Sequence, residues 1–224
     1  MELITESNNF NDYLECGEVI DCKNPEIQEI ANKLSYGIDN ELELIKTVYE
    51  FVRDEIRHSS SAGEKTVTWK AFENRSFSMP QNVVFRASDV LKYKHGLCFA
   101  NSHLLAAILR NLEIPTGFCY QKLEFDHGFG LHGLNAVYIK SIHKWIRLDA
   151  RGNENGIDAQ FSLDKERLAY LVNEEKGEFN FPIIFSKPNN KVVEILKNSH
   201  NLDEAIQKVI SVNWFQELMY IYGL

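Results

Sequence analysis

The hydrophobic pattern changes its period near residue 115, and this change constrains the fold more than any other feature. Between residues 97 and 112 apolar side chains recur at helical spacing, and Pro115 prevents the helix from continuing. From Thr116 onward the pattern alternates, which predicts strands over residues 116–124, 132–140 and 144–149. Helices followed by strands are typical of an α+β fold with an antiparallel meander, and not of alternating βαβ units.

Helical periodicity predicts further helices on both sides of this region. Residues 25–35 form one, with Asn24 as cap and Pro25 in the first position, and residues 40–56 form another. A short helix starts at residue 87, capped by Ser88 or a neighbour, and a closing helix covers residues 202–211. A short strand is expected at 157–161, followed by an irregular stretch through Pro182 and Pro188.

The charge balance limits the classes of partner. With 24 basic against 32 acidic residues the net charge is −8, so no electrostatic footprint for nucleic acid or an anionic membrane is expected. A peptide or small amide is the expected partner. No metal-ligand spacing and no glycine-rich phosphate loop occurs, so neither metal nor cofactor is expected. The first residues lack the pattern of a secretory signal, and no apolar run approaches the roughly 18 residues of a membrane span, which predicts a cytoplasmic protein.

The cysteines are Cys16, Cys22, Cys98 and Cys119, with no C-x-x-C pair among them. Cys16 and Cys22 are close enough in sequence for a disulfide to be considered. In a reducing cytosol we expect both to be ordinary small residues in the thiol form.

Cys98 is the candidate nucleophile because it opens the strongest helix, two residues after Gly96. The first N–H groups of a helix are unpaired and carry the positive end of the helix dipole, which favours a thiolate. Gly96 allows the chain to approach the helix sharply. The N–H of Cys98 is then expected to be available as an oxyanion donor. Alone, such a cysteine is more often a buried small hydrophobic residue.

His132 and Asp149 are the candidate partners of this thiol, from two adjacent strands. A two-residue loop that pairs Lys140 with His143, or a four-residue loop that pairs Ile139 with Lys144, makes His132 and Asp149 diagonal neighbours on one sheet face. A three-residue loop would put them on opposite faces. Each residue alone is more often structural, but a cysteine, a base and an orienting carboxylate together are what acyl transfer requires.

Two segments resemble the transglutaminase-like superfamily, in particular small bacterial members provisionally described as cysteine proteases. The first covers residues 87–91, 96–100 and 104–115 around the cysteine, and the second contains His132 and the run Trp145-Ile146-Arg147-Leu148-Asp149. The resemblance extends over roughly residues 42–152 and implies a papain-like core, in which the cysteine-bearing helix packs on an antiparallel sheet. It also implies that Cys98 is nucleophile, His132 base and then acid, and Asp149 the orienting carboxylate.

The sequence departs from the family pattern at two places. Asn135 stands where many members have an acidic residue, and Asp149-Ala150-Arg151 replaces Asp-Pro-Thr. The expected activity is a thiol-dependent amide hydrolase such as a cysteine protease or amidase, because nothing in the sequence identifies a second binding site for an amine. The alternatives are a protein-glutamine or arylamine acyltransferase, or a non-catalytic peptide-binding module on the same fold.

The length of 224 residues predicts one domain. We divide it into a helical entry lobe at 1–57, a catalytic core at 87–152 and a C-terminal extension at 153–224. Four further residues near the core are expected to be structural or peripheral: Gln81 in a turn, His103 off the Cys98 face of its helix, His127 in a loop, and Trp145 in the core.

Overall fold

The computed structural model describes residues 1–59, 83–125, 128–154 and 156–211. Its helices are α1 (Pro25–Ser35), α2 (Glu41–Glu55), α3 (Ala87–Tyr93), α4 (Cys98–Asn111), α5 (Asn190–Asn198) and α6 (Leu202–Ser211). Asparagine side chains cap α1, α2 and α5 by accepting hydrogen bonds from N–H groups of the first turn.

The main sheet has four antiparallel strands in the order β6-β5-β4-β7. These are β4 (Thr116–Phe125), β5 (Gly128–Ile139), β6 (Lys144–Leu148) and β7 (Phe179–Asn180). Two short parallel pairs lie outside it: β1 (Ile4–Thr5) with β8 (Ile183–Ile184), and β2 (Arg57–His58) with β3 (His95–Gly96).

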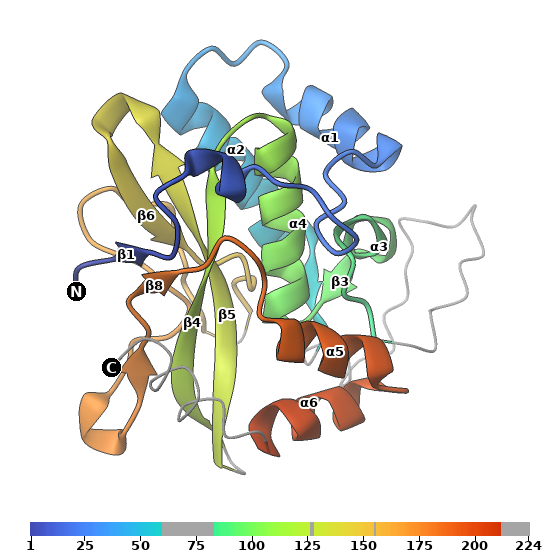
Figure 1. Ribbon diagram of the computed structural model, residues 1–224, viewed down its shortest axis with the longest axis vertical. Helices are drawn as coiled ribbons and strands as arrows, with labels where there is room; N and C mark the ends of the chain where they lie inside the picture. Colours follow the sequence, from blue (N-terminus) through green and yellow to red (C-terminus); the bar gives the residue numbers. More distant parts are fainter. Residues whose placement is uncertain (60–82, 126–127, 155, 212–224) are drawn as a thin grey trace.

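Helix α4 is the centre of the molecule. It contacts β4 and β5 of the sheet on one side and α1, α2 and α3 on the other, as Figure 1 shows. Every residue from Cys98 to Arg110 is buried, because a helix covered by a sheet and by other helices has no solvent-facing side. The fold is therefore α+β, with the cysteine-bearing helix packed on an antiparallel sheet, as the sequence predicted.

Three sequence-based expectations about elements were wrong. Residues 157–161 form no strand and contribute only an isolated bridge between Gln160 and Arg167. The stretch expected to be irregular through Pro182 and Pro188 contains β7 and β8, and α5, which was not predicted, follows it. Ser88 is not a cap: it lies inside α3, where Asp21 accepts the hydrogen bond of its backbone N–H at 3.0 Å.

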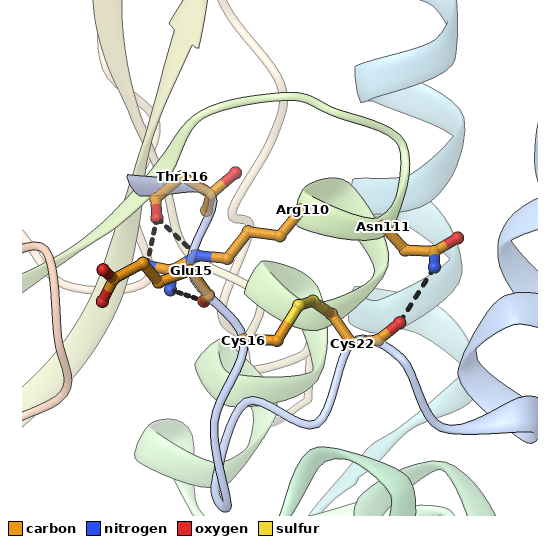
Figure 2. The surroundings of a disulfide bond; sticks show 6 residues. All are labelled: Glu15, Cys16, Cys22, Arg110, Asn111 and Thr116. Carbon is orange, nitrogen blue, oxygen red and sulfur yellow. Dashed lines mark hydrogen bonds between the residues drawn. A yellow bond between two sulfur atoms is a disulfide. The ribbon is translucent and has the colours of Figure 1, made fainter. Parts of the chain in front are cut away.

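A disulfide joins Cys16 to Cys22, which corrects the expectation that both are free thiols (Figure 2). The segment folds back on itself, since the N–H groups of Gly17 and Cys22 both donate to the carbonyl of Ile20, at 3.0 and 2.8 Å. This brings the two Cα atoms to 5.5 Å, within the range that a disulfide spans. Sequence spacing alone does not reveal such a loop.

The last turn of α4 anchors this disulfide loop (Figure 2). The buried guanidinium of Arg110 donates to the carbonyl oxygens of Glu15, Thr116 and Ser186 at 2.6–2.7 Å, and Asn111 donates to the carbonyl of Cys22 at 2.9 Å. The C-terminal end of α4 is thereby tied to three separate parts of the chain. Cys98 lies at the other end of the same helix.

Candidate active site

Cys98 is the first residue of α4, following Leu97 as N-cap. A Cβ atom at Gly96 would lie 2.7 Å from Oδ1 of Asn101 and 2.9 Å from Cβ of Ala100. Glycine is needed here because the incoming chain touches the first turn of the helix. Only 9% of the surface of Cys98 is exposed, and the residue lines a cavity of about 280 Å³.

His132 and Asp149 meet as the four-residue loop predicts. Ile139 pairs with Lys144 and Asn135 with Leu148, a register that carries Asp149, just after β6, to the level of Leu134. Oδ2 of Asp149 accepts a hydrogen bond from Nε2 of His132 at 2.8 Å, and both side chains are buried. Because Nε2 carries this proton, Nδ1 is the ring nitrogen left to face the thiol.

Backbone contacts hold Asp149 in place from several directions. Its carboxylate accepts hydrogen bonds from the N–H groups of Arg151 at 3.2 Å and Ala169 at 3.0 Å, and its carbonyl accepts one from the Tyr49 hydroxyl of α2 at 3.2 Å. Burial raises the pKa of Asp149, but the charge and hydrogen bond of His132 and these N–H donors outweigh it and lower the pKa. The carboxylate therefore stays ionised.

The thiol and the imidazole stabilise each other's charged forms. Burial raises the pKa of Cys98, but the charge and hydrogen bond of His132, followed by those of His58, lower it well below the usual value. Burial lowers the pKa of His132, but the charges of Asp149 and Cys98 raise it above the usual value. The pair favours thiolate and imidazolium, the reactive combination for a nucleophilic cysteine.

His58 is the neighbour that the sequence analysis missed. The pairing of β2 with β3 sets His58 beside Gly96, and Nε2 of His58 accepts a hydrogen bond from the N–H of Cys98 at 3.2 Å. The Cys98 N–H is therefore occupied, which corrects the expectation that it is an available oxyanion donor. No periodicity marks a two-residue parallel strand pair, so no signal in the sequence pointed to His58.

The cavity beside the thiol has a largely apolar lining drawn from several separate parts of the chain. Leu97 and Phe99 come from the start of α4, Leu131 from β5, Tyr170 from the segment after β6, and Ile206 and Val209 from α6. The ring of Tyr170 stands edge-on to that of His132, with centroids 5.0 Å apart. The C-terminal part of the chain thus helps to enclose the site.

The remaining candidates lie away from this chemistry. His103 is buried and bonded through Nδ1 to the carbonyl of Phe85 at 2.7 Å, and Trp145 packs against Tyr13 and Tyr138, so both are structural as expected. Asn135 ties β5 to α4 by donating to the carbonyl of Ser102 at 3.0 Å. Gln81 and His127 lie outside the described residues.

A comparison with protein-family models matches residues 28–150 to the transglutaminase-like superfamily. The chain belongs to this superfamily. Membership indicates an enzyme of the thiol-dependent kind. None of the curated proteins compared with the chain matches it significantly.

Solved structures that match the chain include a "putative cysteine protease" from Cytophaga hutchinsonii, which is 18% identical with a TM-score of 0.47 over 65% of this chain and 43% of its own. A protein described as a TGase is 15% identical with a TM-score of 0.42 over 91% of this chain and 52% of its own. Red sea bream transglutaminase is 13% identical with a TM-score of 0.36 over 68% of this chain and 29% of its own. The chain thus spans about half or less of their lengths, and the family assignment rests on the family model.

Among the described helices, none has both the length and the apolar composition needed to cross a bilayer. Within the same residues, no three His, Cys, Asp or Glu side chains gather in a way that could hold a metal ion.

Proposed function

We propose that this transglutaminase-like protein is a thiol-dependent amide hydrolase, with Cys98 as nucleophile, His132 as base and acid, and Asp149 as the carboxylate that orients His132. The observation that carries the proposal is the buried 2.8 Å hydrogen bond between Nε2 of His132 and Asp149, beside a helix-start thiol that faces a cavity. A purely structural histidine has no need of a carboxylate at one ring nitrogen and a thiolate at the other, whereas His132 has Asp149 and Cys98 in these places.

The first half of the reaction forms an acyl-enzyme. The thiolate of Cys98 attacks the carbonyl carbon of an amide, and the carbonyl π electrons move to oxygen. Collapse of this intermediate breaks the C–N bond, while His132 gives its Nδ1 proton to the leaving amine. Asp149 keeps Nε2 protonated throughout, so Nδ1 always faces the reacting atoms.

In the second half a nucleophile resolves the thioester. His132, now neutral, removes a proton from water, which attacks the acyl carbon and releases the acid and the thiol. We propose water because no described feature marks a second binding site for an amine; an amine at the same position would make the reaction an acyl transfer.

The test is detection of the acyl-enzyme by intact-mass spectrometry after acid quenching. The protein is incubated with a panel of peptide amides and activated acyl esters. We expect an acyl adduct on Cys98 that decays in water, and no adduct on Cys98→Ala. Addition of a primary amine measures partition to transfer.

A matched control distinguishes the site cysteine from a buried one. Cys119 is fully buried, and burial raises its pKa to about 12, so Cys119→Ala should retain acylation. Full acylation of Cys98→Ala would refute the proposal, and tight peptide binding without any acyl-enzyme would favour the binding-module alternative.

A further inference from the structure

Arg151 is a buried cation at the cavity, and among the described residues no carboxylate forms an ion pair with it. It lines the cavity with only 9% of its surface exposed, and its Nη1 is enclosed without a hydrogen-bond acceptor. Neither Asp149 nor Glu154, the carboxylates closest to it in sequence, forms an ion pair with it. Its guanidinium lies over the ring of Tyr170, 5.5 Å from the centroid, and also interacts with the Tyr170 hydroxyl through its charge and a side-chain hydrogen bond.

Such an arrangement is unfavourable in the free protein. A buried charge loses its hydration, and an unpaired one recovers little of that energy from its surroundings. The contact with the Tyr170 ring offsets part of the loss. Elsewhere in this chain buried arginines are well bonded: Arg110 donates to three carbonyl groups, and Arg147 forms a two-point contact with Glu166. Arg151 is different, and it is the one that borders the cavity.

Arg151 also lies close to the reacting groups. Its backbone N–H donates to Asp149, and the Tyr170 ring that it contacts stands edge-on to His132. Among the described lining residues there is no Asp or Glu, and Arg151 is the only Lys or Arg. An anionic group on a bound ligand would meet an attractive charge near the thiol and no repulsive carboxylate in the lining.

We propose that Arg151 binds a carboxylate of the substrate, so that the enzyme selects apolar amide substrates bearing a free carboxylate a few bonds from the scissile carbonyl. A guanidinium presents two parallel N–H donors that match the two oxygens of a carboxylate. The apolar lining accepts the hydrocarbon part of the same substrate. The inference rests on the proposed function, since it assigns the substrate class of that site.

The carboxylate can belong to the acyl part or to the amine part of the substrate, and two pairs of thiol-reactive probes distinguish these. The first pair is a leucine acyloxymethyl ketone with an N-succinyl group or a neutral N-acetyl group. The second is an epoxysuccinyl leucine amide with a free carboxylate or its ethyl ester beyond the epoxide. The measurement is the second-order rate constant for labelling of Cys98, followed by mass spectrometry.

We expect the wild type to prefer the anionic member of at least one pair by about tenfold or more, as for a hydrogen bond to a charged group. Arg151→Met should reduce that ratio to near one, and Arg151→Lys should keep part of it. Because each ratio is internal to one variant, a general change in thiol reactivity cancels. Arg167→Met, which removes an exposed arginine with the same change in net charge, should keep the wild-type ratio.

Two other outcomes separate the inference from the function beneath it. Equal labelling by both members of both pairs, or a preference that survives in Arg151→Met, would overturn the role of Arg151 while the thiol chemistry stands. Failure of every probe to label Cys98 would remove the proposed function and the inference with it. If Arg151→Met instead slows neutral and anionic members equally, Arg151 supports the thiolate and does not bind substrate.

Discussion

At the scale of single residues, the two free cysteines show what the site does to a thiol. Cys98 and Cys119 are both buried, and burial alone favours the neutral thiol. Without a suitable partner, Cys119 keeps a pKa raised to about 12, whereas His132 and His58 lower the pKa of Cys98 to about 5. The difference comes from two imidazole neighbours and not from exposure.

Asp149→Asn tests the orienting role of the carboxylate. The asparagine has the same shape but no charge to stabilise the His132 imidazolium, and its amide group can reverse the hydrogen bond that fixes Nε2 as the protonated nitrogen. We expect the acylation rate to fall by about 10²–10⁴-fold with the fold retained. Stopped-flow acylation and circular dichroism measure the two quantities. A rate within twofold of wild type would show that Asp149 has no part in the chemistry.

His58→Ala tests the second imidazole through a pH profile. Removing a group that lowers the pKa of Cys98 should raise that pKa, so the thiolate fraction near pH 6 falls while at pH 9 it stays close to wild type. Iodoacetamide labelling rates between pH 4 and 10 measure this. The wild-type rate should be nearly constant above about pH 6, one unit above its thiol pKa. An unchanged profile in His58→Ala would mean that only His132 sets the thiol pKa.

At the scale of elements, the sequence predicted the parts that depend on local patterns. Helix α1 has the predicted bounds, the start of α4 is as expected, and Cys98, His132 and Asp149 lie together, in the one of the β5–β6 registers left open by the sequence that puts His132 and Asp149 on one face. It did not predict contacts between distant short segments. The pairing of β2 with β3 that brings in His58, and the N–H of Ala169 on Asp149, leave no periodic signal.

Helix α5 was missed for a different reason. Its cap Asn189 and its apolar residues at helical spacing were present in the sequence, but Pro182 and Pro188 just before them made the region read as irregular. Arg151 was visible only as a departure from the family pattern, because sequence does not reveal that a charge lacks a partner.

Gly133→Ala tests how β5 meets α4. A Cβ at this position would lie 2.5 Å from Cδ1 of the Phe99 ring, and Phe99 directly follows Cys98. Overpacking of this kind costs about 1–3 kcal/mol, and each kcal/mol lowers the melting temperature of a chain of this size by about 2–4 °C. We also expect slower acylation, because the first turn of α4 must shift. Gly17→Ala, with no atom within 4 Å of the added Cβ, is the control and should leave the melting temperature and the acylation rate unchanged. A melting temperature of Gly133→Ala equal to wild type would show that Phe99 can rotate away.

At the scale of the whole molecule, α4 connects the site to the disulfide. Its first residue is the candidate nucleophile, and its last turn holds the Cys16–Cys22 loop through Arg110 and Asn111. A disulfide is a sign of an oxidising compartment, because cytosolic reductants keep thiols reduced. It therefore stands against the cytoplasmic location proposed from the sequence. The oxidation state of Cys16 and Cys22 in the cell distinguishes an oxidising compartment from the cytoplasm.

The state of the pair can be measured by counting thiols in protein isolated from its native cells with a rapid alkylating quench. We expect two alkylated cysteines, Cys98 and Cys119, and a peptide in which Cys16 and Cys22 remain linked; four alkylated cysteines would mean that the disulfide is absent in the cell and would favour the cytoplasm.

Cys16→Ala measures how much the disulfide stabilises the protein. Closing so short a loop restricts the unfolded chain and thereby stabilises the folded protein by about 2 kcal/mol. The free energy of unfolding, measured by urea denaturation, should therefore be lower by that amount in Cys16→Ala. Acylation at Cys98 should be unchanged, because the disulfide lies at the far end of α4. A loss of acylation in Cys16→Ala under conditions where the protein stays folded would instead reveal that the two ends of α4 are coupled.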